Sequence, residues 1–320
     1  MARELTLPEP HTRDAFDELF ALVNNWGKWG PDDQLGTLNY ITLAHVQRAA
    51  SLVLLGRQIS MALPLDGCAA ADNPHPAMHY IVQGHDIDAQ SMGVTFATDF
   101  MGLAFHGMRH THMDALCHVA YRGTVYNGKP ALEVVTTKGA TTLDVTGYKQ
   151  GLVGRGVLLD VPRHRGVEWL EPGEAVTRAE LCAIEEAEGV RVGEGDILVF
   201  RTGHSRRRAA LGPWDPGYPP IGEGRAGLHV DTLPWMHDRR VAAFLPDGDG
   251  ETVPSNVQGV AYPIHALQLV SMGLFASDSL QLDDLAAACS ELGRFEFMVV
   301  GLPLQLPGGT GSPWNPIAIL

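Results

Sequence analysis

The sequence predicts an α/β fold in which short buried strands are covered by amphipathic helices. The chain has 320 residues, 45% hydrophobic and 19% charged, which is the balance of a soluble globular protein with a large core. Short apolar and β-branched runs bounded by Gly, Pro or Asp are typical of strands, and capped amphipathic segments between them are typical of helices. The length favours one large domain or two closely joined ones.

The first predicted element is an N-terminal helical segment over about residues 13–56. Apolar residues recur at helical spacing over 13–23 and predict the first helix. Turn-forming residues predict a loop over 24–39. A second helix is predicted over 41–56, with Thr42 as its N-cap.

The middle of the chain has the sequence pattern of strands separated by helices. The predicted strands lie within residues 57–65, 93–100, 156–161, 195–203 and 240–247. The third and fourth of these runs are apolar almost throughout, so both of their faces should be buried beneath helices. The candidates for those helices are residues 177–189 and 279–293, and Thr177 begins a capping box in the first. The tail, about residues 305–320, predicts a C-terminal arm packed on this subunit or on a neighbour.

Composition narrows the class of partner. The net charge of -14 disfavours nucleic acid and anionic membrane surfaces, so a small molecule is the expected partner. The four cysteines form no CxxC pair, which favours a reduced compartment. The first residues lack the apolar region of a secretory signal, and no run reaches the length of a membrane span, so a cytoplasmic location is expected.

The stretch HGMRHTHMDALCH, residues 106–118, is the strongest functional signal in the chain. It places four histidines around Asp114, and imidazole and carboxylate groups are the common ligands of divalent metals. Any single histidine is more often a surface group or a core residue bonded to backbone. Several polar groups on one buried face would each need a partner, so the cluster as a whole predicts a metal site.

The geometry expected of this stretch follows from strand periodicity. If residues 105–114 are extended, His110, His112 and Asp114 project from one face about 6.6 Å apart. His106 would lie about 20 Å from His112 and could join them only if the chain bends at Gly107. His118 would stand on the same side if the chain turns helically after Asp114.

The stretch resembles the motif of the cyclase family of metal-dependent hydrolases, which includes bacterial kynurenine formamidase and isatin hydrolase. Thr111, His112, Asp114 and His118 match the family pattern. Met108 stands at the family's first histidine, and a thioether is a poor ligand for hard cations. His110 or His106 is the candidate replacement.

The resemblance extends from about Trp29 to Leu285 and implies further site residues. His265 matches a family histidine, and Asp278 falls at a position that is usually Glu. Asp278 is either a metal ligand or the N-cap of the helix predicted at 279–293.

The resemblance implies a single domain over residues 1–320 with a swivelling β/β/α fold, in which a mixed sheet curled toward a barrel is flanked by helices. It also implies one or two Mn²⁺ or Zn²⁺ ions, held by His112, Asp114 and His265 with His110 or Asp278. His118 would be the proton-transfer residue. The reaction implied is hydrolysis of a small amide, formamide or lactam-like C–N bond by metal-activated water. The implied assembly is a homodimer or homotetramer.

Four residues are candidates for substrate binding: Arg109, His204, Asp247 and Trp29. Cys117 would be a nucleophile only as an activated thiolate. Two alternatives remain at this stage. One is a degenerate family member that has lost the metal and binds a small ligand without hydrolysis. The other is a cyclase or dehydratase acting on a polyketide-like substrate.

Overall fold

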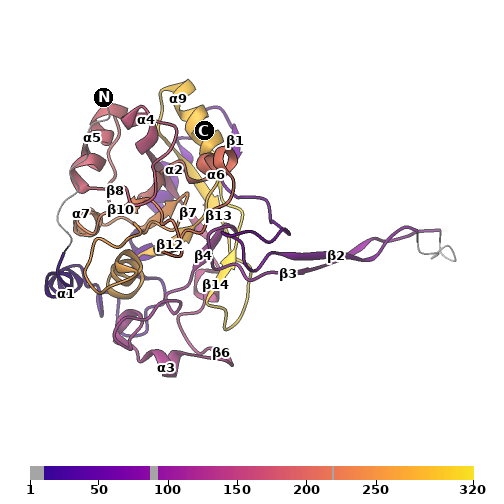
Figure 1. Cartoon of the computed structure of the whole chain (residues 1–320), viewed down its shortest axis with the longest axis horizontal. Helices are drawn as coiled ribbons and strands as arrows, with labels where there is room; N and C mark the ends of the chain where they lie inside the picture. The colour runs from indigo at the N-terminus through magenta and orange to yellow at the C-terminus, as the bar shows by residue number, and fades with distance from the viewer. Residues whose placement is uncertain (1–10, 87–92, 218–219) are drawn as a thin grey trace.

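The computed structural model describes residues 11–86, 93–217 and 220–320, and its centre is a nine-stranded mixed sheet (Figure 1). The sheet is curled into a half-barrel and flanked by helices, as the sequence predicts. In spatial order its strands are β1 (Gln58–Ser60), β15 (Ile317–Ile319), β13 (Glu296–Gly301), β7 (Leu152–Asp160), β9 (Ile197–Arg201), β11 (Ala243–Pro246), β12 (Phe275–Asp278), β4 (His112–Asp114) and β14 (Gly311–Pro313). The four strands β7, β9, β11 and β12 run parallel, and the pairings outside them are antiparallel.

Helices and smaller strand pairs surround this sheet. The α-helices are α1 (Arg13–Leu22), α2 (Leu43–Ala50), α3 (Ala131–Val134), α4 (Val161–Arg165), α5 (Arg178–Glu188), α6 (His204–Leu211), α7 (Thr232–Asp238), α8 (Pro263–His265) and α9 (Asp283–Leu292). The other helical turns are η1 (Gly36–Tyr40), η3 (Tyr126–Gly128), η4 (Val145–Tyr148) and the π-helix η5 (Ala266–Met272). The minor strand pairs are β2 (Met78–Gln83) with β3 (Thr98–Gly102), β5 (Val135–Thr136) with β6 (Gly139–Ala140), and β8 (Ala175–Val176) with β10 (Gly227–Leu228).

The parallel strands of the sheet are buried on both faces, as the apolar runs at 156–161 and 195–203 predict. Along β9 the side chains alternate between two hydrophobic clusters, with Val199 in one and Leu198 in the other. Helix α9 contributes Leu285 to the first cluster, while α5 contributes Leu181 to the second. Helices therefore cover both faces of the parallel strands, which is the usual environment of such strands. No helix in the described part of the chain is long and apolar enough to cross a membrane.

The N-terminal helices are where the sequence places them, although the second is shorter. Helix α1 matches the prediction for residues 13–23. Helix α2 begins at the predicted cap, where the Thr42 hydroxyl accepts from the backbone N–H of His45, but it ends at Ala50. The backbone beyond it bonds to other elements, because Leu55 N–H donates to the Leu320 carbonyl over 3.1 Å. Tertiary hydrogen bonds thus replace the last helical turn.

The C-terminal segment packs on this subunit. Strand β15 inserts between β1 and β13, and β14 forms the edge beside β4. Helix α9 begins at Asp283, later than the predicted 279, and its N-cap is Leu282. Asp278 is the last residue of β12, so the interpretation of Asp278 as a helix cap is wrong.

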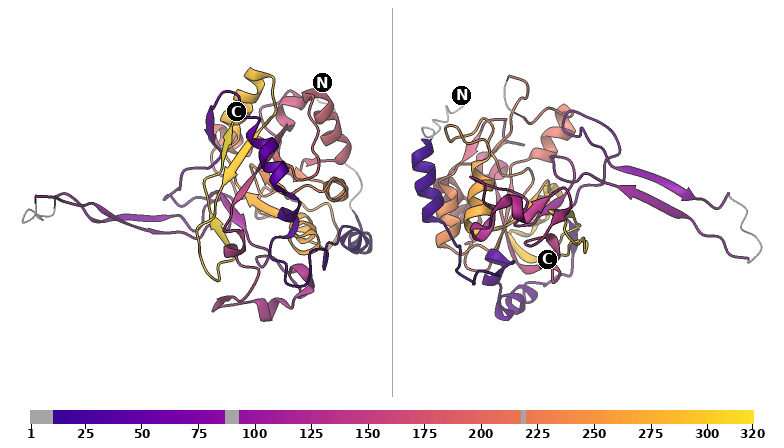
Figure 2. Two further views of the ribbon diagram at one scale, coloured as in Figure 1. Left: turned by 180° about the vertical axis from the view of Figure 1, so that it is seen from behind. Right: turned by 90° about the horizontal axis from the view of Figure 1, so that it is seen from below.

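A long β2–β3 hairpin projects from the body of the molecule (Figure 2). It contains the predicted strand at 93–100, which the structure begins only at Thr98. The two strands of the hairpin are exposed along nearly their whole length.

Candidate metal centre

Strand β4 brings together residues that are far apart in the sequence. It lies beside β12 in antiparallel register, with His112 opposite Asp278. The Nε2 atom of His112 is 3.6 Å from Asp114 Oδ1 and 3.8 Å from Asp278 Oδ2. The Nδ1 atom of His112 lies 2.8 Å from the His110 carbonyl, so Nδ1–H donates there and the Nε2 lone pair faces the two carboxylates.

His106 joins this cluster because the chain preceding β4 is bent. The prediction of an extended strand over 105–114 is wrong for all but residues 112–114, since the segment before them forms bends. Gly107 has a φ of 153°, a conformation that L side chains rarely adopt. The bend places His106 Nδ1 3.0 Å from Asp114 Oδ1. The His106 ring also stacks on that of His118, with ring centroids 3.7 Å apart.

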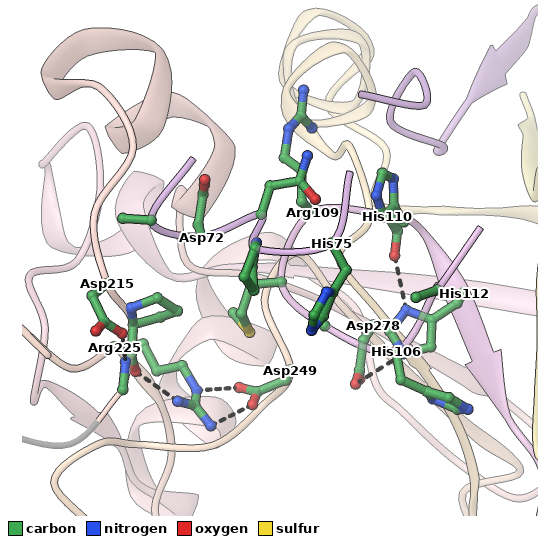
Figure 3. Close-up of a pocket in the computed structure, with 18 of the residues that line it drawn as sticks. Asp72, His75, His106, Arg109, His110, His112, Asp215, Arg225, Asp249 and Asp278 are labelled. Carbon is green, nitrogen blue, oxygen red and sulfur yellow. Dashed lines mark hydrogen bonds and ion pairs between the residues drawn. The ribbon is translucent and has the colours of Figure 1, made fainter. Parts of the chain in front are cut away.

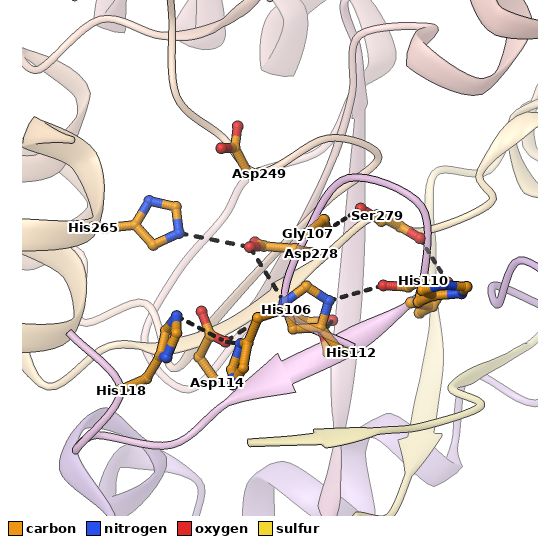
Figure 4. Close-up of polar contacts among 12 residues, drawn as sticks. His106, Gly107, His110, His112, Asp114, His118, Asp249, His265, Asp278 and Ser279 are labelled. Carbon is orange, nitrogen blue, oxygen red and sulfur yellow. Dashed lines mark hydrogen bonds and ion pairs between the residues drawn. The ribbon is translucent and has the colours of Figure 1, made fainter. Parts of the chain in front are cut away.

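His118 follows β4 through a tight turn, in which its N–H donates to the Ala115 carbonyl over 2.9 Å. This is the turn that the sequence requires for His118 to stand near Asp114. Its Nε2 atom lies 3.9 Å from Asp114 Oδ1 (Figure 4). The His118 side chain also lines the pocket described below.

His265 approaches from the other side, at the end of α8. Its Nε2 atom lies 3.5 Å from Asp278 Oδ2. Glu251 holds the opposite edge of the ring, because its Oε1 accepts from both the backbone N–H of His265 at 2.8 Å and Nδ1–H at 3.0 Å. This contact fixes the ring so that Nε2 faces Asp278, a role that carboxylates often have beside metal-binding histidines.

Two overlapping groups of ligand atoms result, and they share Asp114. One consists of His106, His112 and Asp114, the other of Asp114, His265 and Asp278, and within each group the ligand atoms lie within 4.8 Å of one another. Both oxygens of Asp114 and His106 Nδ1 are buried, and apart from the ion-pair contacts given above they have no hydrogen-bond partner. Imidazole nitrogens and carboxylate oxygens suit Zn²⁺ and Mn²⁺, so the residues present fit a divalent cation.

The electrostatics of the cluster agree with its geometry. Burial alone would raise the pKa of Asp114, but His118 and His106 hold it below its usual range. Burial lowers the pKa of His118 to about 4 against the pull of Asp114. Burial also opposes the charge on His265, but Asp278 and Glu251 raise the pKa of this imidazole well above its usual value. Asp114 is thus set to attract positive charge, whereas burial raises the pKa of Asp278. His118 is neutral near pH 7.

A pocket of about 510 Å³ opens onto the cluster (Figure 3). Its wall away from β4 contains a buried ion pair in which Arg225 donates from Nε to Asp249 Oδ1 over 2.8 Å. The guanidinium of Arg225 also lies 5.6 Å from the ring centre of Tyr262. Met108, at the position of the family's first histidine, lines the pocket as well.

The structure distinguishes between His106 and His110, the two candidates to supply the metal ligand that Met108 cannot. His106 belongs to a ligand group, whereas His110 belongs to neither group found among the described residues. The ring of His110 is buried in the pocket wall with both nitrogens unpaired, and only its backbone carbonyl contacts His112. Geometry therefore favours His106.

The predicted substrate-binding residues fall in different places. Arg109 lines the pocket and pairs with Asp66 over 2.9 Å. Asp247 does not face the pocket, since its oxygens accept four bonds from the chain at residues 202–204. The ring of His204 packs at a tilt of 46° against Trp214, with ring centroids 4.6 Å apart.

Trp29 packs edge-on against Tyr40, with ring centroids 5.1 Å apart, and does not line the pocket. Cys117 is buried, and burial raises the pKa of its thiol to about 12, which is the opposite of an activated nucleophile.

Glu251, Asp249 and Arg225 were missed by sequence reasoning. The first two lie in the loop DGDGE, only a few residues after Asp247. An acidic, Gly-rich loop after a buried strand is the signal that could have indicated them. Which of its carboxylates face the site depends on the path of the loop.

Comparison with known proteins agrees with this fold. A family model described as "Putative cyclase" matches residues 53–249. The solved structure of a protein described as a novel cyclase has 34% identity and a TM-score of 0.83, covering 94% of this chain and 99% of that one. No curated protein matches.

Two more distant structures share the fold. An isatin hydrolase bound to a product analogue has 20% identity and a TM-score of 0.56, covering 88% of this chain and 99% of that one. Isatin hydrolase A from Labrenzia aggregata has 19% identity and a TM-score of 0.58, covering 85% and 98%.

The architecture is the fold that the isatin hydrolases share, and its histidine–aspartate cluster forms two candidate metal sites. The family model matches more than half of the chain, and the novel cyclase is 34% identical over nearly the whole chain, so these two matches identify the family. The chain belongs to the cyclase family.

Proposed function

We propose that this protein is a metal-dependent hydrolase that cleaves a small amide, formamide or lactam-like C–N bond. The observation that carries the proposal is the convergence of His106, His112 and Asp114 with His265 and Asp278 at one end of a pocket. A bound Mn²⁺ or Zn²⁺ would lower the pKa of water and polarise a substrate carbonyl. The two isatin hydrolases with this fold act, by their names, on such a lactam.

The chain's own residues supply proton transfer and orientation. His118 is neutral near pH 7, so its Nε2 can accept a proton from the attacking water and return it to the leaving nitrogen. Its ring is held by the stack on His106. Glu251 fixes the His265 ring through Nδ1, which leaves Nε2 directed toward the cluster.

The substrate would occupy the pocket between this cluster and the Arg225–Asp249 pair. Arg225 donates to Asp249 and to the Pro216 carbonyl, so it stiffens the wall. Arg109 donates from Nε to Asp66, and its terminal nitrogens are the candidate contact for a substrate carboxylate.

The test is elemental analysis of the wild type beside His112→Ala and Asp114→Ala after loading with Mn²⁺ or Zn²⁺ and desalting. We expect stoichiometric metal in the wild type and near-complete loss in both variants. The control is Leu132→Ser, at an 87% exposed position in α3, which should retain the wild-type metal content through loading and desalting. Metal retained by both site variants would refute the ligand assignment.

Activity is then measured on a panel of small amides, formamides and lactams that includes isatin. A second candidate, cyclisation or dehydration of a polyketide-like substrate, is favoured by the description of the matching family. A loaded protein that leaves every C–N bond intact but converts such a substrate would support that candidate. A wild type that holds no metal but binds small ligands would support a binding protein.

A further inference from the structure

The C-terminal segment lies directly against the strand that carries the candidate metal ligands. Strand β14 pairs with β4 in antiparallel register, with Gly311 opposite Asp114. Thr310, the residue before β14, accepts from the Ala115 N–H through its carbonyl over 2.9 Å. One edge of β4 therefore faces β12, and its other edge faces the C-terminal segment (Figure 1).

Glycine lets this segment come so close. A Cβ added at Gly311 would lie 2.5 Å from the Met113 carbonyl oxygen and 2.9 Å from Cε1 of His106. A glycine inside a strand often marks such an approach of another backbone. Within the run GGTG at residues 308–311, Thr310 is thus the one residue with a side chain.

The hydroxyl of Thr310 contacts the imidazole of His106. Thr310 Oγ1 lies 3.0 Å from Nε2 of His106, while Nδ1 of the same ring lies 3.0 Å from Asp114 Oδ1. A hydroxyl oxygen can accept from a ring N–H. When Nε2 carries the hydrogen and donates it to Thr310, the lone pair of Nδ1 faces the cluster.

Two contacts together leave this ring one orientation. The stack on His118, at an interplanar angle of 1°, fixes the plane of the His106 ring. A half-turn about the Cβ–Cγ bond would keep that plane but would exchange Nδ1 for Cδ2, a carbon that binds no ion. The same half-turn would replace Nε2 by Cε1 beside Thr310, so the hydrogen bond opposes it.

The other two histidines of the candidate metal centre are held in a similar way. His265 has the carboxylate of Glu251 at its Nδ1, and His112 has a backbone carbonyl at its Nδ1. In both rings this is the nitrogen that points away from the carboxylates of the cluster. Partners of this kind fix the tautomer and the orientation of metal-binding histidines. Thr310 occupies the corresponding place at Nε2 of His106.

We propose that Thr310 is a positioning residue that holds His106 with Nδ1 toward the metal centre. The inference rests on the proposed metal centre, and it is independent of the reaction proposed there. Thr310 acts through the imidazole of His106, so the C-terminal segment is a working part of the centre. Loss of this one hydroxyl should therefore weaken metal binding.

The test is the dissociation constant for Mn²⁺, measured by electron paramagnetic resonance titration of the metal-free full chain. Thr310→Val keeps the shape of the side chain but loses the hydroxyl, and should weaken binding by about 10- to 100-fold. Thr310→Ser keeps the hydroxyl and should restore most of the affinity. The matched control is Thr124→Val, which removes a half-buried hydroxyl that donates to the Tyr121 carbonyl, and it should bind Mn²⁺ as the wild type does.

A double-mutant cycle shows whether Thr310 acts through His106. In a chain that already carries His106→Ala, Thr310→Val should change the dissociation constant by less than about twofold, because the ring that it positions is gone. An equal loss of affinity in both backgrounds would mean a general structural role and would overturn the proposal. Far-UV circular dichroism confirms that each variant is folded.

The visible spectrum of the Co²⁺-loaded protein gives a second readout, because it follows the ligand set and its geometry. The spectrum of Thr310→Val should shift toward that of His106→Ala, whereas Thr310→Ser should match the wild type. A Thr310→Val chain with the wild-type spectrum would contradict a positioning role.

The outcomes separate this inference from the proposed hydrolase activity. A Thr310→Val chain that binds Mn²⁺ as tightly as the wild type would overturn the inference and leave the hydrolase proposal intact. Variants that behave as expected in a chain that cleaves no C–N bond would support the inference and refute the proposed reaction. A wild type with no measurable Mn²⁺ binding would overturn the inference together with the ligand assignment.

Discussion

His106 and His110 are four residues apart, and replacing each by Ala separates their roles. Removing a residue that only hydrogen-bonds to a metal ligand typically weakens metal binding by about 10- to 100-fold. Losing a direct ligand should therefore cost at least about 100-fold in affinity, or about 2.7 kcal/mol. His106 Nδ1 lies 3.0 Å from Asp114 Oδ1, so His106→Ala should weaken Mn²⁺ binding by that factor. His110→Ala removes a ring outside both ligand groups and should change the affinity less than about threefold, or about 0.6 kcal/mol.

The assay is thermal unfolding with and without Mn²⁺ at 100 times the wild-type Kd. A ligand at that concentration stabilises the wild type by about 2.7 kcal/mol, but stabilises a variant with 100-fold weaker binding by only about 0.4 kcal/mol. With roughly 2 °C per kcal/mol for a chain of this size, the metal-induced shift in Tm is about 5 °C in the wild type and about 1 °C in His106→Ala. The reasoning is refuted if His110→Ala loses the shift while His106→Ala keeps it.

Three further outcomes are expected. His118→Ala should lower kcat by roughly 10²- to 10⁴-fold while Mn²⁺ content, measured by elemental analysis, stays at the wild-type level; loss of metal instead would make His118 a ligand. Burial raises the pKa of Glu188 from 4.5 to about 8, so the folded protein keeps a proton that the unfolded chain releases, and stability falls as pH rises between these values. Glu188→Gln should therefore unfold at a higher temperature than the wild type at pH 8.5, by a margin that shrinks at pH 5, and equal differences at both pH values would contradict this. Gly36→Ala should lower the free energy of unfolding, measured in urea titrations, by roughly 3 kcal/mol. The reason is that a Cβ there would lie 2.0 Å from the Gly273 carbonyl oxygen and φ is +56°. An unchanged midpoint would show that the backbone at residue 36 can move away from Gly273.

Sequence reasoning predicted the elements whose signals are local. The capping threonines Thr42 and Thr177 begin helices as expected, and the apolar runs that became β7 and β9 are buried on both faces. The spacing of His112 and Asp114 on a strand also held. These features depend on neighbouring residues, whose preferences can be read from the chain.

The parts that failed depend on contacts between distant segments. His106 reaches Asp114 only because the chain bends at Gly107. The prediction assumed a straight strand over 105–114, which would have kept the two residues apart. Glu251 reaches His265 because the loop after β11 brings its carboxylate to the backbone N–H and Nδ1 of His265. Asp278 lies in the cluster and does not cap a helix, because β12 continues to that residue before the chain turns.

The antiparallel pairing of β4 with β12 also determines when the centre can form during synthesis. His112 and Asp114 leave the ribosome in the first half of translation, whereas His265 and Asp278 emerge in its last fifth. A nascent chain therefore exposes three of the five candidate ligands, His106 among them, long before the other two exist. In the proposed metal centre, the complete set of ligands exists only after β12 has been made and lies beside β4, so a chain stalled before Asp278 would lack at least one proposed ligand.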